Sequence, residues 1–335
     1  MLCALEPLSI NNRIVIFEPM NRTNKISVTV ITGFLGAGKT TFINSVLKKY
    51  PDTQFALVEN EFGDVSIDTK LIKGIDASRM FELKQGCICC TISGEYELVL
   101  LELAELFPNV DHLIIETTGV ADPAPVIRPF FRDENLHSVY QYNGAVCLVD
   151  AIHFENSPEK EITLKQVAVA DLILVSKSEN LSEIQKEKFK ENLQKINPFA
   201  EIEFTQFTGS DFFNFGGFGV RDSFNQNSFP QKPKFSFVEI SNSHTNLSTK
   251  TLFFNQPLNK KQFTNWLSYT LDLYKNEIYR AKGILCFENE PFEHILQGVG
   301  GSFELVEGET IIRKNISSLV FIGRLTNLDI NFGER

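Results

Sequence analysis

Short apolar runs separated by polar, helix-like stretches occupy the first half of the chain. The run ISVTVIT at 26–32 is dominated by β-branched residues, which predicts a buried strand. Four similar runs predict further strands: QFALVEN at 54–60, HLIIET at 112–117, GAVCLVDA at 144–151 and DLILVSK at 171–177. Segments with apolar residues at helical spacing lie between or after them, namely TTFINSVLKKY, GEYELVLLELAELF and EIQKEKFKENLQKI. Strands that alternate with helices predict a parallel, doubly wound α/β sheet.

The texture of the sequence changes in the second half of the chain. Residues 208–233 are rich in Gly, Asn, Ser and Phe without any period, which predicts a linker. Beyond it come the apolar runs FSFVEI, TKTLFFN, AKGILCFE, SFELVE and SLVFIGRL, together with a helix predicted from about 259 to 276. Strands around one strong helix predict a smaller α+β domain over 234–328. We therefore expect two domains, 26–207 and 234–328, after a flexible N-terminal extension of residues 1–25.

Composition and charge narrow the classes of function. With 335 residues, 43% hydrophobic and 22% charged, the chain has room for two globular domains. Its formal net charge of −10 argues against a general binder of nucleic acid or anionic membranes, because both favour basic patches. No apolar run approaches the roughly 20 residues that span a bilayer, and the N-terminus lacks a basic secretory leader. We expect a cytoplasmic protein with no nucleic-acid or membrane partner.

The segment GFLGAGKTT at 33–41 fits the pattern G-x-x-x-x-G-K-[ST]. In this pattern glycines let backbone N–H groups wrap phosphates, and the following helix points its positive end at them. Lys39 is expected to reach the β- and γ-phosphates, and the Thr40 hydroxyl is expected to bind Mg²⁺. A strand before the segment and a helix after it disfavour an ordinary glycine turn. The sequence therefore predicts a nucleoside triphosphate site formed by Gly33, Gly36, Ala37, Gly38, Lys39, Thr40 and Thr41.

The strand predicted at 112–117 ends in an acid and is followed by a glycine. A carboxylate there, Glu116, could hold the water shell of the Mg²⁺, a role that such nucleoside triphosphatases usually give to aspartate. Gly119 would let the next segment move with the γ-phosphate. A strand-end acid alone is often only solvated, but the glycine-rich loop makes the catalytic interpretation of Glu116 the stronger one.

The loop LVSKSE at 174–179 follows the last strong strand, where a base-reading loop would lie. Guanine-reading loops usually have the form Asn/Thr-Lys-x-Asp, whose acid accepts from guanine N1–H and the exocyclic amine. Here Ser176 and Glu179 replace the usual end residues, while Lys177 is retained. Adenine offers no donor pair to such an acid, so GTP is favoured over ATP. The alternative is an exposed helix start without a ligand.

Three of the six cysteines, Cys87, Cys89 and Cys90, lie within four positions. Thiolates bind Zn²⁺ tightly, and three of them would leave the fourth tetrahedral position open for exchange. The alternatives are a redox pair of Cys87 and Cys90, and coincidence in a buried loop. In an extended chain the first two face one way and the third the other, so two thiolates plus a carboxylate is an equal alternative. Cobalt or iron could replace zinc, because affinity order alone does not select the metal.

The segment VENEFGDVSID at 58–68 supplies carboxylates, among them Glu59 and Asp64. It follows the second predicted strand, where many GTPases of this type carry their first switch. A metal held between these acids and the thiol loop would respond to the nucleotide state. We regard metal binding as the stronger interpretation of the thiol cluster.

Taken together, TGFLGAGKTT, ENEFGDVSID, GCICC, ETTGVADPAPV, AKGIL and VFIG resemble the CobW-like metallochaperone GTPases from about residue 26 to 325. The resemblance implies a P-loop GTPase domain followed by a CobW C-terminal domain, with weak intrinsic GTP hydrolysis. It also implies that Cys87, Cys89 and Cys90 bind metal, most commonly zinc, with Glu59 and Asp64 as accessory ligands. Members are thought to deliver metal to client metalloproteins, and some to associate with a second copy when nucleotide is bound.

Two departures from the family pattern bear on function. The Ser-Lys-Ser-Glu loop weakens the guanine assignment, and the five histidines are dispersed rather than gathered in a tract. High metal-storage capacity is therefore not expected. The hypothesis is a GTP-dependent metallochaperone that couples GTP binding and hydrolysis to metal transfer. A GTP-dependent zinc sensor, cobalt or iron delivery, and a redox ATPase are the alternatives.

Overall fold

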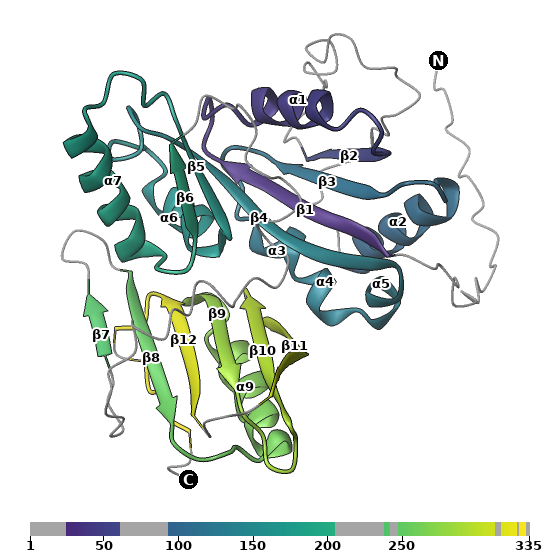
Figure 1. The fold of residues 1–335 in the computed structure, drawn as a ribbon, viewed down its shortest axis with the longest axis vertical. Helices are drawn as coiled ribbons and strands as arrows, with labels where there is room; N and C mark the ends of the chain where they lie inside the picture. The colour runs from purple at the N-terminus through teal and green to yellow at the C-terminus, as the bar shows by residue number, and fades with distance from the viewer. Residues whose placement is uncertain are drawn as a thin grey trace, which may run out of the picture.

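Two six-stranded sheets form the described part of the protein (Figure 1). The computed structural model describes residues 25–60, 93–204, 238–241, 247–311, 316–326 and 328–332. Within these ranges, none of the helices is long and apolar enough to cross a lipid bilayer.

The first sheet is parallel throughout, with strand order β2-β3-β1-β4-β5-β6. Its strands are β1 (Ile26–Gly33), β2 (Phe55–Asn60), β3 (His112–Thr117), β4 (Tyr140–Asp150), β5 (Leu172–Ser176) and β6 (Glu201–Phe204). Its helices are α1 (Lys39–Lys49), α2 (Ser93–Leu106), α3 (Ala124–Ile127), α4 (Pro129–Arg132), α5 (Glu134–Val139), α6 (Lys160–Val169) and α7 (Glu183–Ile196). The predicted doubly wound α/β architecture is confirmed.

Alternate residues of the strands pack on opposite faces of this sheet. Ile31, Leu57 and Ile114 face α1, with Phe42 and Val46 of that helix. The other face packs against α2 to α7, and of these α3, α4 and α5 lie below the first sheet in Figure 1, on the side of the second sheet. Because both faces are covered, β1 to β5 are mostly apolar, as in other parallel sheets, whereas the edge strand β6 carries Glu201 and Glu203. The continuous apolar runs in the sequence have this physical cause.

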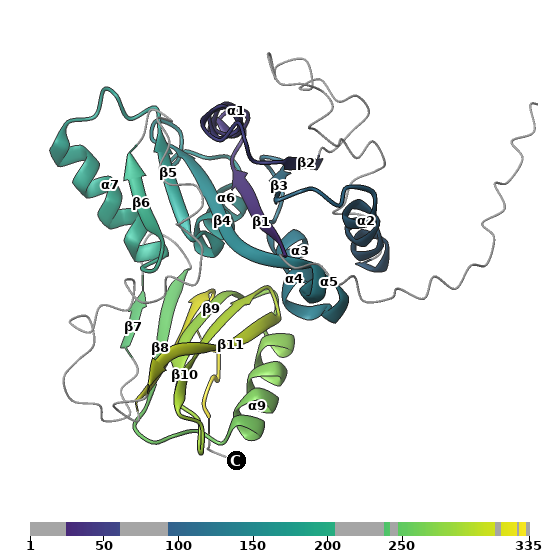
Figure 2. The same cartoon turned by 45° about the vertical axis from the view of Figure 1, so that its right-hand side comes forward.

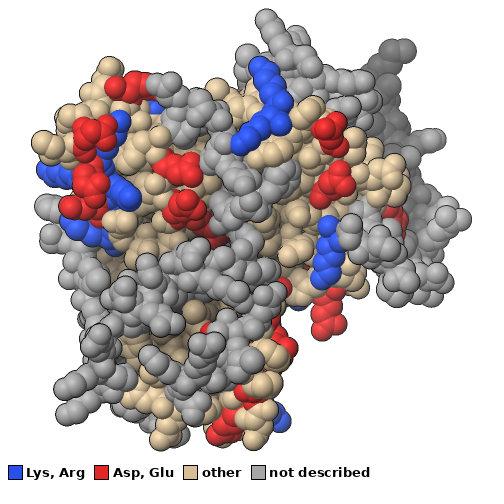
Figure 3. Space-filling view, in the orientation of Figure 1, with Lys and Arg blue, Asp and Glu red and all other residues tan. Residues whose placement is uncertain are grey.

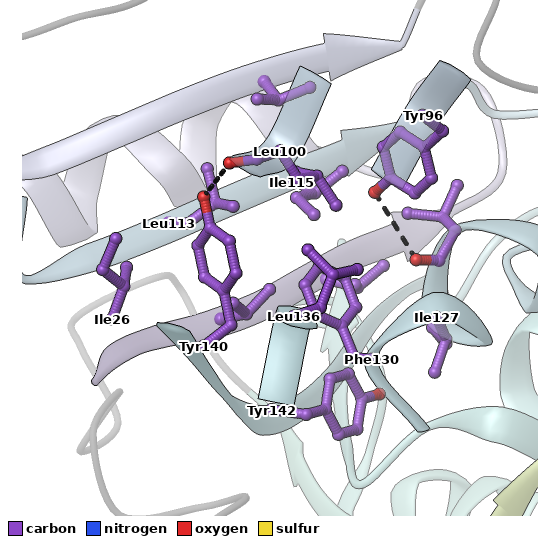
Figure 4. Close-up of a cluster of buried hydrophobic side chains, with 14 of the residues drawn as sticks. Ile26, Tyr96, Leu100, Leu113, Ile115, Ile127, Phe130, Leu136, Tyr140 and Tyr142 are labelled. Carbon is purple, nitrogen blue, oxygen red and sulfur yellow. Dashed lines mark hydrogen bonds between the residues drawn. The ribbon is translucent and has the colours of Figure 1, made fainter. Parts of the chain in front are cut away.

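Two tyrosine hydroxyls inside this core keep hydrogen-bond partners (Figure 4). Tyr140 donates to the carbonyl of Leu100 at 2.6 Å, and Tyr96 donates to that of Val126 at 3.5 Å. The first bond ties β4 to α2 and the second ties α2 to α3. Buried polar groups are tolerated when they are paired in this way, so α2 is fixed over the sheet.

Helix α7 closes the outer end of the first sheet. Ser182 and Gln185 form a reciprocal capping box at its start, which satisfies orphan N–H groups of the first turn. Phe189, Leu193 and Ile196 pack inward. Lys and Glu side chains are interspersed over its outer face in Figure 3, as expected for a solvated helix.

The second sheet is antiparallel, with strand order β11-β10-β9-β12-β8-β7. Its strands are β7 (Val238–Ser241), β8 (Ser248–Phe254), β9 (Ile278–Leu285), β10 (Phe292–Val299), β11 (Ser302–Ile311) and β12 (Ser317–Gly323). Helix α9 (Lys260–Leu273) covers one face of it, as Figure 2 shows, and buries Phe263, Leu267 and Leu271. The predicted smaller α+β unit with one strong helix is therefore present. Strand β10 was not predicted, because Glu293, His294 and Gln297 interrupt its apolar pattern.

The two sheets are joined through α6 and the β10–β11 turn. Helix α6 packs on β9 and β12, and α4 packs on β11. A Cβ atom on Gly300 would lie 2.7 Å from that of Ala124, so the turn approaches α3 closely. Buried Arg280 of β9 contacts the Val169 carbonyl at the end of α6 at 2.9 Å. The second domain thus packs on α3, α4 and α6 of the first.

Candidate nucleotide site

The loop between β1 and α1 has a backbone that only glycine adopts easily. Gly33, Gly36 and Gly38 have φ values of 135°, 74° and 99°, in the left-handed region. A Cβ on Gly33 would also lie 2.3 Å from the Leu148 carbonyl oxygen. A Cβ on Gly36 would meet no atom within 4 Å, so the described residues leave the space over the loop open there. The pattern of glycines therefore has a conformational cause, and the loop has the backbone that a phosphate cradle needs.

The first turn of α1 follows this cradle directly and has no side-chain cap. The helix begins after Gly38 with no side-chain cap and with no acidic residue in its first turn. Its initial N–H groups and its positive dipole end are consequently available to an anion. Thr40 is half-buried and Thr41 is exposed in that turn. A phosphate chain is the ligand that such an arrangement accepts best.

Lys39 lies across the same loop. Its side chain is only 8% exposed, and its ammonium donates to the Gly33 carbonyl at 2.9 Å. A buried ammonium held by a neutral carbonyl gains much from a nearby anion, because burial penalises the charged form. Lys39 is therefore placed to interact with phosphate oxygens of a ligand in the cradle.

The carboxyl ends of β1, β2 and β3 lie side by side. The register places Glu116 of β3 opposite Ile31 of β1 and Glu59 of β2. The Thr117 hydroxyl donates to that of Thr32 at 3.0 Å, which locks the two strand ends together. Glu116 is partly exposed at this edge, beside the phosphate cradle. The described residues thus bring together the strand-end acid and the loop, as a magnesium-assisted site requires.

The segment after β3 rests directly on the cradle. A Cβ on Gly119 would lie 2.5 Å from the backbone nitrogen of Leu35, so any side chain would force the two loops apart. The Thr118 hydroxyl is buried and has no hydrogen-bond partner within the described ranges. Sequence reasoning identified Gly119 but missed Thr118, which carries no motif signal. An unpaired buried hydroxyl beside the loop is a group that a ligand could satisfy.

The predicted base loop is tied to the phosphate loop through Ser176. Its buried hydroxyl donates to the carbonyls of Ala37 at 2.8 Å and Val149 at 3.3 Å. Lys177 has a φ of 56°, and its ammonium lies 2.6 Å from the carboxylate of Asp150. Glu179 is exposed. Ser176 therefore joins the two loops, while Lys177 and Glu179 remain at the surface where a base would be read.

Asp150 was not predicted, although it is the anchor of this loop. Besides Lys177, it accepts from His153 Nδ1 at 2.9 Å and from the backbone N–H of Ile152 at 2.8 Å. Burial raises the pKa of Asp150, but the Lys177, His153 and Ile152 hydrogen bonds outweigh burial and leave that pKa below its ordinary value. Its carboxylate therefore stays ionised and fixes the start of the loop. The signal was an acid at the end of a buried strand, the same signal that singled out Glu116.

The predicted metal ligands lie outside what the structure describes. Cys87, Cys89, Cys90 and Asp64 are beyond the described ranges, and for Glu59 only the backbone is described. The cysteines that are described, Cys147 and Cys286, are buried and form no disulfide. Burial raises the pKa of Cys147 to about 12, so it is an unreactive core thiol.

A second cluster of metal-ligating residue types lies in the other domain. Ligand atoms of Glu290, His294 and Glu307 lie within 4.8 Å of one another. The ammonium of Lys260 stands among them, 2.9 Å from Glu290 and 3.2 Å from His294 Nε2. Burial and this ammonium lower the pKa of His294. Since Lys260 already supplies the compensating positive charge, the cluster forms an ion-pair network.

Comparison with known proteins agrees with this geometry. Residues 27–204 match the family described as CobW/HypB/UreG, nucleotide-binding domain, and residues 247–332 match the cobalamin synthesis protein cobW C-terminal domain. The chain is 35% identical over 312 residues to the zinc chaperone YjiA of Escherichia coli, covering 90% of this chain and 94% of that one. It is 27% identical to a zinc-regulated GTPase metalloprotein activator of Schizosaccharomyces pombe, over 89% of this chain and 82% of the other.

A solved structure extends the comparison to the fold. The crystal structure of Zn(II)-bound YjiA GTPase from E. coli covers 90% of this chain and 94% of its own, with 30% identity and a TM-score of 0.63. The similarity therefore spans both sheets.

Proposed function

The chain belongs to the CobW/HypB/UreG family of nucleotide-binding proteins, and we propose that it is a GTP-dependent metallochaperone whose cargo is zinc. The observation that carries the nucleotide half is the open cradle of Gly33 to Gly38, with an uncapped α1 and a buried Lys39 beside it. The similarity to a zinc chaperone and to a zinc-regulated GTPase supports the cargo.

In this proposal the chain's own groups do most of the work on the nucleotide. Backbone N–H groups at the start of α1 bind the phosphates, and Lys39 neutralises charge on the β- and γ-phosphates. Ser176 holds the base loop against the phosphate loop, so that the two loops bind the base and the phosphates of one nucleotide together. The close approach of Gly119 to Leu35 holds the turn after β3 against the phosphate loop.

Mg²⁺ fits the donor set at the carboxyl end of the sheet. Thr40 is half-buried at the start of α1, Glu116 is partly exposed, and none of the described residues comes within 4 Å of a Cβ built on Gly36. Oxygen donors of this kind suit Mg²⁺, which is held by one or two protein groups together with phosphates. When bound, Mg²⁺ would neutralise charge that develops on the transferring phosphoryl group. Thr40 would bind it and Glu116 would hold its water shell.

We assign GTP rather than ATP to the site. Exposed Glu179 can accept from the guanine N1–H and amine, and the Lys177 stem can cover the base while Asp150 holds its ammonium. Replacing the usual Asp by Glu179 adds one methylene but keeps the carboxylate. Without a catalytic glutamine or arginine finger in the recognised motifs, intrinsic hydrolysis would be slow.

Zinc would be bound by the thiol cluster of Cys87, Cys89 and Cys90, with Glu59 and Asp64 as accessory ligands. Thiolates favour zinc, although cobalt or iron are the alternatives for the same donors. GTP would order the segment 58–68 and tighten the thiolate site, and hydrolysis would relax it and release the ion. A coupling free energy of about 1–3 kcal/mol changes metal affinity about 5- to 150-fold.

The partner would be a client metalloprotein that receives the ion, and a second copy of the chain when nucleotide is bound. We place this activity in the cytoplasm, where a cysteine thiol such as Cys147 is kept reduced. The second candidate function is a GTP-dependent zinc sensor, favoured by the relative described as zinc-regulated. A sensor would form metal-dependent complexes without transferring zinc to any enzyme.

The test is zinc affinity measured by competition with a chelating dye, with Mg²⁺ and either GDP or a non-hydrolysable GTP analogue. We expect the two affinities to differ at least about 5-fold, in line with the coupling above. Substituting both Cys87 and Cys89 with Ser should abolish tight binding. Equal affinities would overturn the gating, and unchanged affinity in the double variant would overturn the thiolate site.

A further inference from the structure

Gln166, in the middle of α6, is a buried amide that none of the motifs includes. Its side chain is fully buried at 0% exposure. Its Nε2 donates to the carbonyl of Gly119 at 3.1 Å and to that of Ala121 at 3.2 Å. One amide thus holds both ends of the short turn that follows the strand-end acid Glu116.

The turn that Gln166 holds is the part of the first domain that rests on the phosphate loop. Its chain folds back through a bond from Ala121 N–H to the Thr118 carbonyl at 3.1 Å. Its Gly119 leaves no room for a side chain against Leu35. The turn is therefore held between two neighbours, the phosphate loop on one side and Gln166 on the other.

Neighbours of Gln166 on α6 connect the helix to the second domain. Lys165 pairs with Asp122 at 2.9 Å, and its ammonium lies 5.2 Å from the ring centroid of Tyr279 on β9. The carbonyl of Val169 accepts from Arg280 at 2.9 Å. A single rigid helix therefore touches the nucleotide-facing turn on one side and the second sheet on the other.

We propose that Gln166 is a positioning residue for nucleotide hydrolysis, holding the turn 119–121 in register with the phosphate loop and linking it to the second domain through α6. This inference rests on the proposed GTPase function. Gln166 touches no phosphate itself, and it acts only through the carbonyls that it holds. Because a misplacement of about 1 Å can slow an enzyme about 100-fold, losing the two bonds should reduce turnover far more than ligand affinity.

The first test compares Gln166→Leu with Thr163→Val. Thr163 is a buried polar residue of the same helix, and among the described residues its hydroxyl bonds only to Ser157 and to the carbonyl of Glu159. We expect Gln166→Leu to slow single-turnover GTP hydrolysis about 10- to 100-fold while GDP affinity stays within about 2-fold of wild type. Thr163→Val should lose stability but keep the wild-type rate. The proposal is overturned if Gln166→Leu hydrolyses at the wild-type rate, if GDP affinity falls by the same factor as the rate, or if both variants slow equally.

Gln166→Glu gives a second arm that does not depend on the first variant folding. A protonated carboxyl can still donate one hydrogen bond to the carbonyls, whereas a carboxylate cannot. Its hydrolysis rate, divided by that of wild type, should therefore fall as pH rises, and a ratio independent of pH would contradict the positioning role.

Hydrogen exchange of residues 118–123 separates this inference from the proposed function. Faster exchange there in Gln166→Leu, with unchanged exchange in β1 and β3, would show that Gln166 holds the turn, whether or not wild type hydrolyses GTP. Failure of wild-type hydrolysis would overturn the proposed function, and with it the role of Gln166 in hydrolysis, but not its hold on the turn. Unchanged exchange in the turn would sink the role of Gln166 alone.

Discussion

The two ends of the parallel sheet both bury polar side chains, but they do so differently. At the amino end, Asp171 precedes β5 and is neutralised by Arg280 and Lys282 of β9 at 2.5 and 2.7 Å, while accepting from the Ala145 N–H at 3.0 Å. Burial raises the pKa of Asp171, but the two cations outweigh burial and leave that pKa below its usual range. This end is closed by the second domain.

At the carboxyl end the polar groups are arranged around an open cradle. Lys39 is held by a neutral carbonyl, the first turn of α1 has no side-chain cap, and the Thr118 hydroxyl is buried without a described partner. A closed network contributes to holding domains together, whereas groups left to a ligand contribute affinity for it. Substitutions at the amino end should therefore change stability, and those at the carboxyl end should change ligand binding.

The largest expected effect comes from opening the closed end. Arg280→Met removes one of the two cations facing Asp171, and breaking a buried pair in this way costs about 3–5 kcal/mol of unfolding free energy. Urea denaturation measures the loss, and GDP affinity of the folded fraction should stay at the wild-type value. The matched control is Arg324→Met, whose partner Glu161 is half-exposed, and which should cost about 0–1 kcal/mol. Equal losses in both variants would mean that the buried network is not what stabilises the interface.

The converse substitution is Lys39→Ala at the open end. Without its ammonium the phosphates lose a buried charge-assisted contact, and such bonds contribute about 1.5–3 kcal/mol, so GDP affinity should fall about 10- to 150-fold. Titration with a fluorescent GDP analogue checks this, with the exposed Lys48→Ala as control. The unfolding free energy should hardly change. A large loss of stability with little loss of affinity would reverse the roles given to the two ends.

Acidification tests a second closed group, His112 at the start of β3. Its Nε2 bonds to the Thr29 hydroxyl at 2.8 Å, and burial lowers its pKa to about 3 from an ordinary 6.5. Below about pH 6.5 the unfolded chain therefore binds a proton on His112 that the folded chain does not bind. The contribution of neutral His112 to the free energy of unfolding is fully present above that pH. It should be lost at about 1.4 kcal/mol per pH unit as the pH falls toward about 3.

His112→Gln keeps a donor at this position but does not titrate. Urea denaturation of wild type and variant between about pH 7 and 5 should show a weaker pH dependence in the variant, by about 2 kcal/mol over that range. Identical slopes would show that the acid sensitivity comes from other groups.

How much of this contrast the sequence predicts depends on how local each signal is. The phosphate loop, Glu116 and Gly119 could be predicted from the sequence, because each of these signals lies within a few residues of the strand that precedes it. Asp171, Arg280 and Gln166 have no such signal, because their partners are far away in the sequence. Arg280 lies 111 residues from Val169 and 109 residues from Asp171, and Gln166 lies 47 residues from Gly119. Only the fold brings them together.

How local the signal is also explains which strands could be predicted from the sequence. Strands β1 to β5 are buried on both faces and give unbroken apolar runs, so they were predicted. Strand β10 is only partly buried over its first residues and carries Glu293, His294 and Gln297, so its sequence lacks an unbroken apolar run. The thiol cluster remains a prediction from residue chemistry, because it lies beyond the described ranges.

The smallest expected effect lies at the seam between the two loops of the open end. Ser176→Ala removes the hydroxyl that donates to the carbonyls of Ala37 and Val149, whereas Ser176→Thr keeps it. One neutral hydrogen bond contributes about 1 kcal/mol, so GDP and GTP affinity should both fall about 5-fold in the alanine variant. The threonine variant should bind as wild type does. Because the seam joins base loop to phosphate loop, GDP should lose more affinity than inorganic pyrophosphate, which has no base to be held. An equal loss for both ligands would place the effect in the phosphate loop alone and remove Ser176 from base recognition.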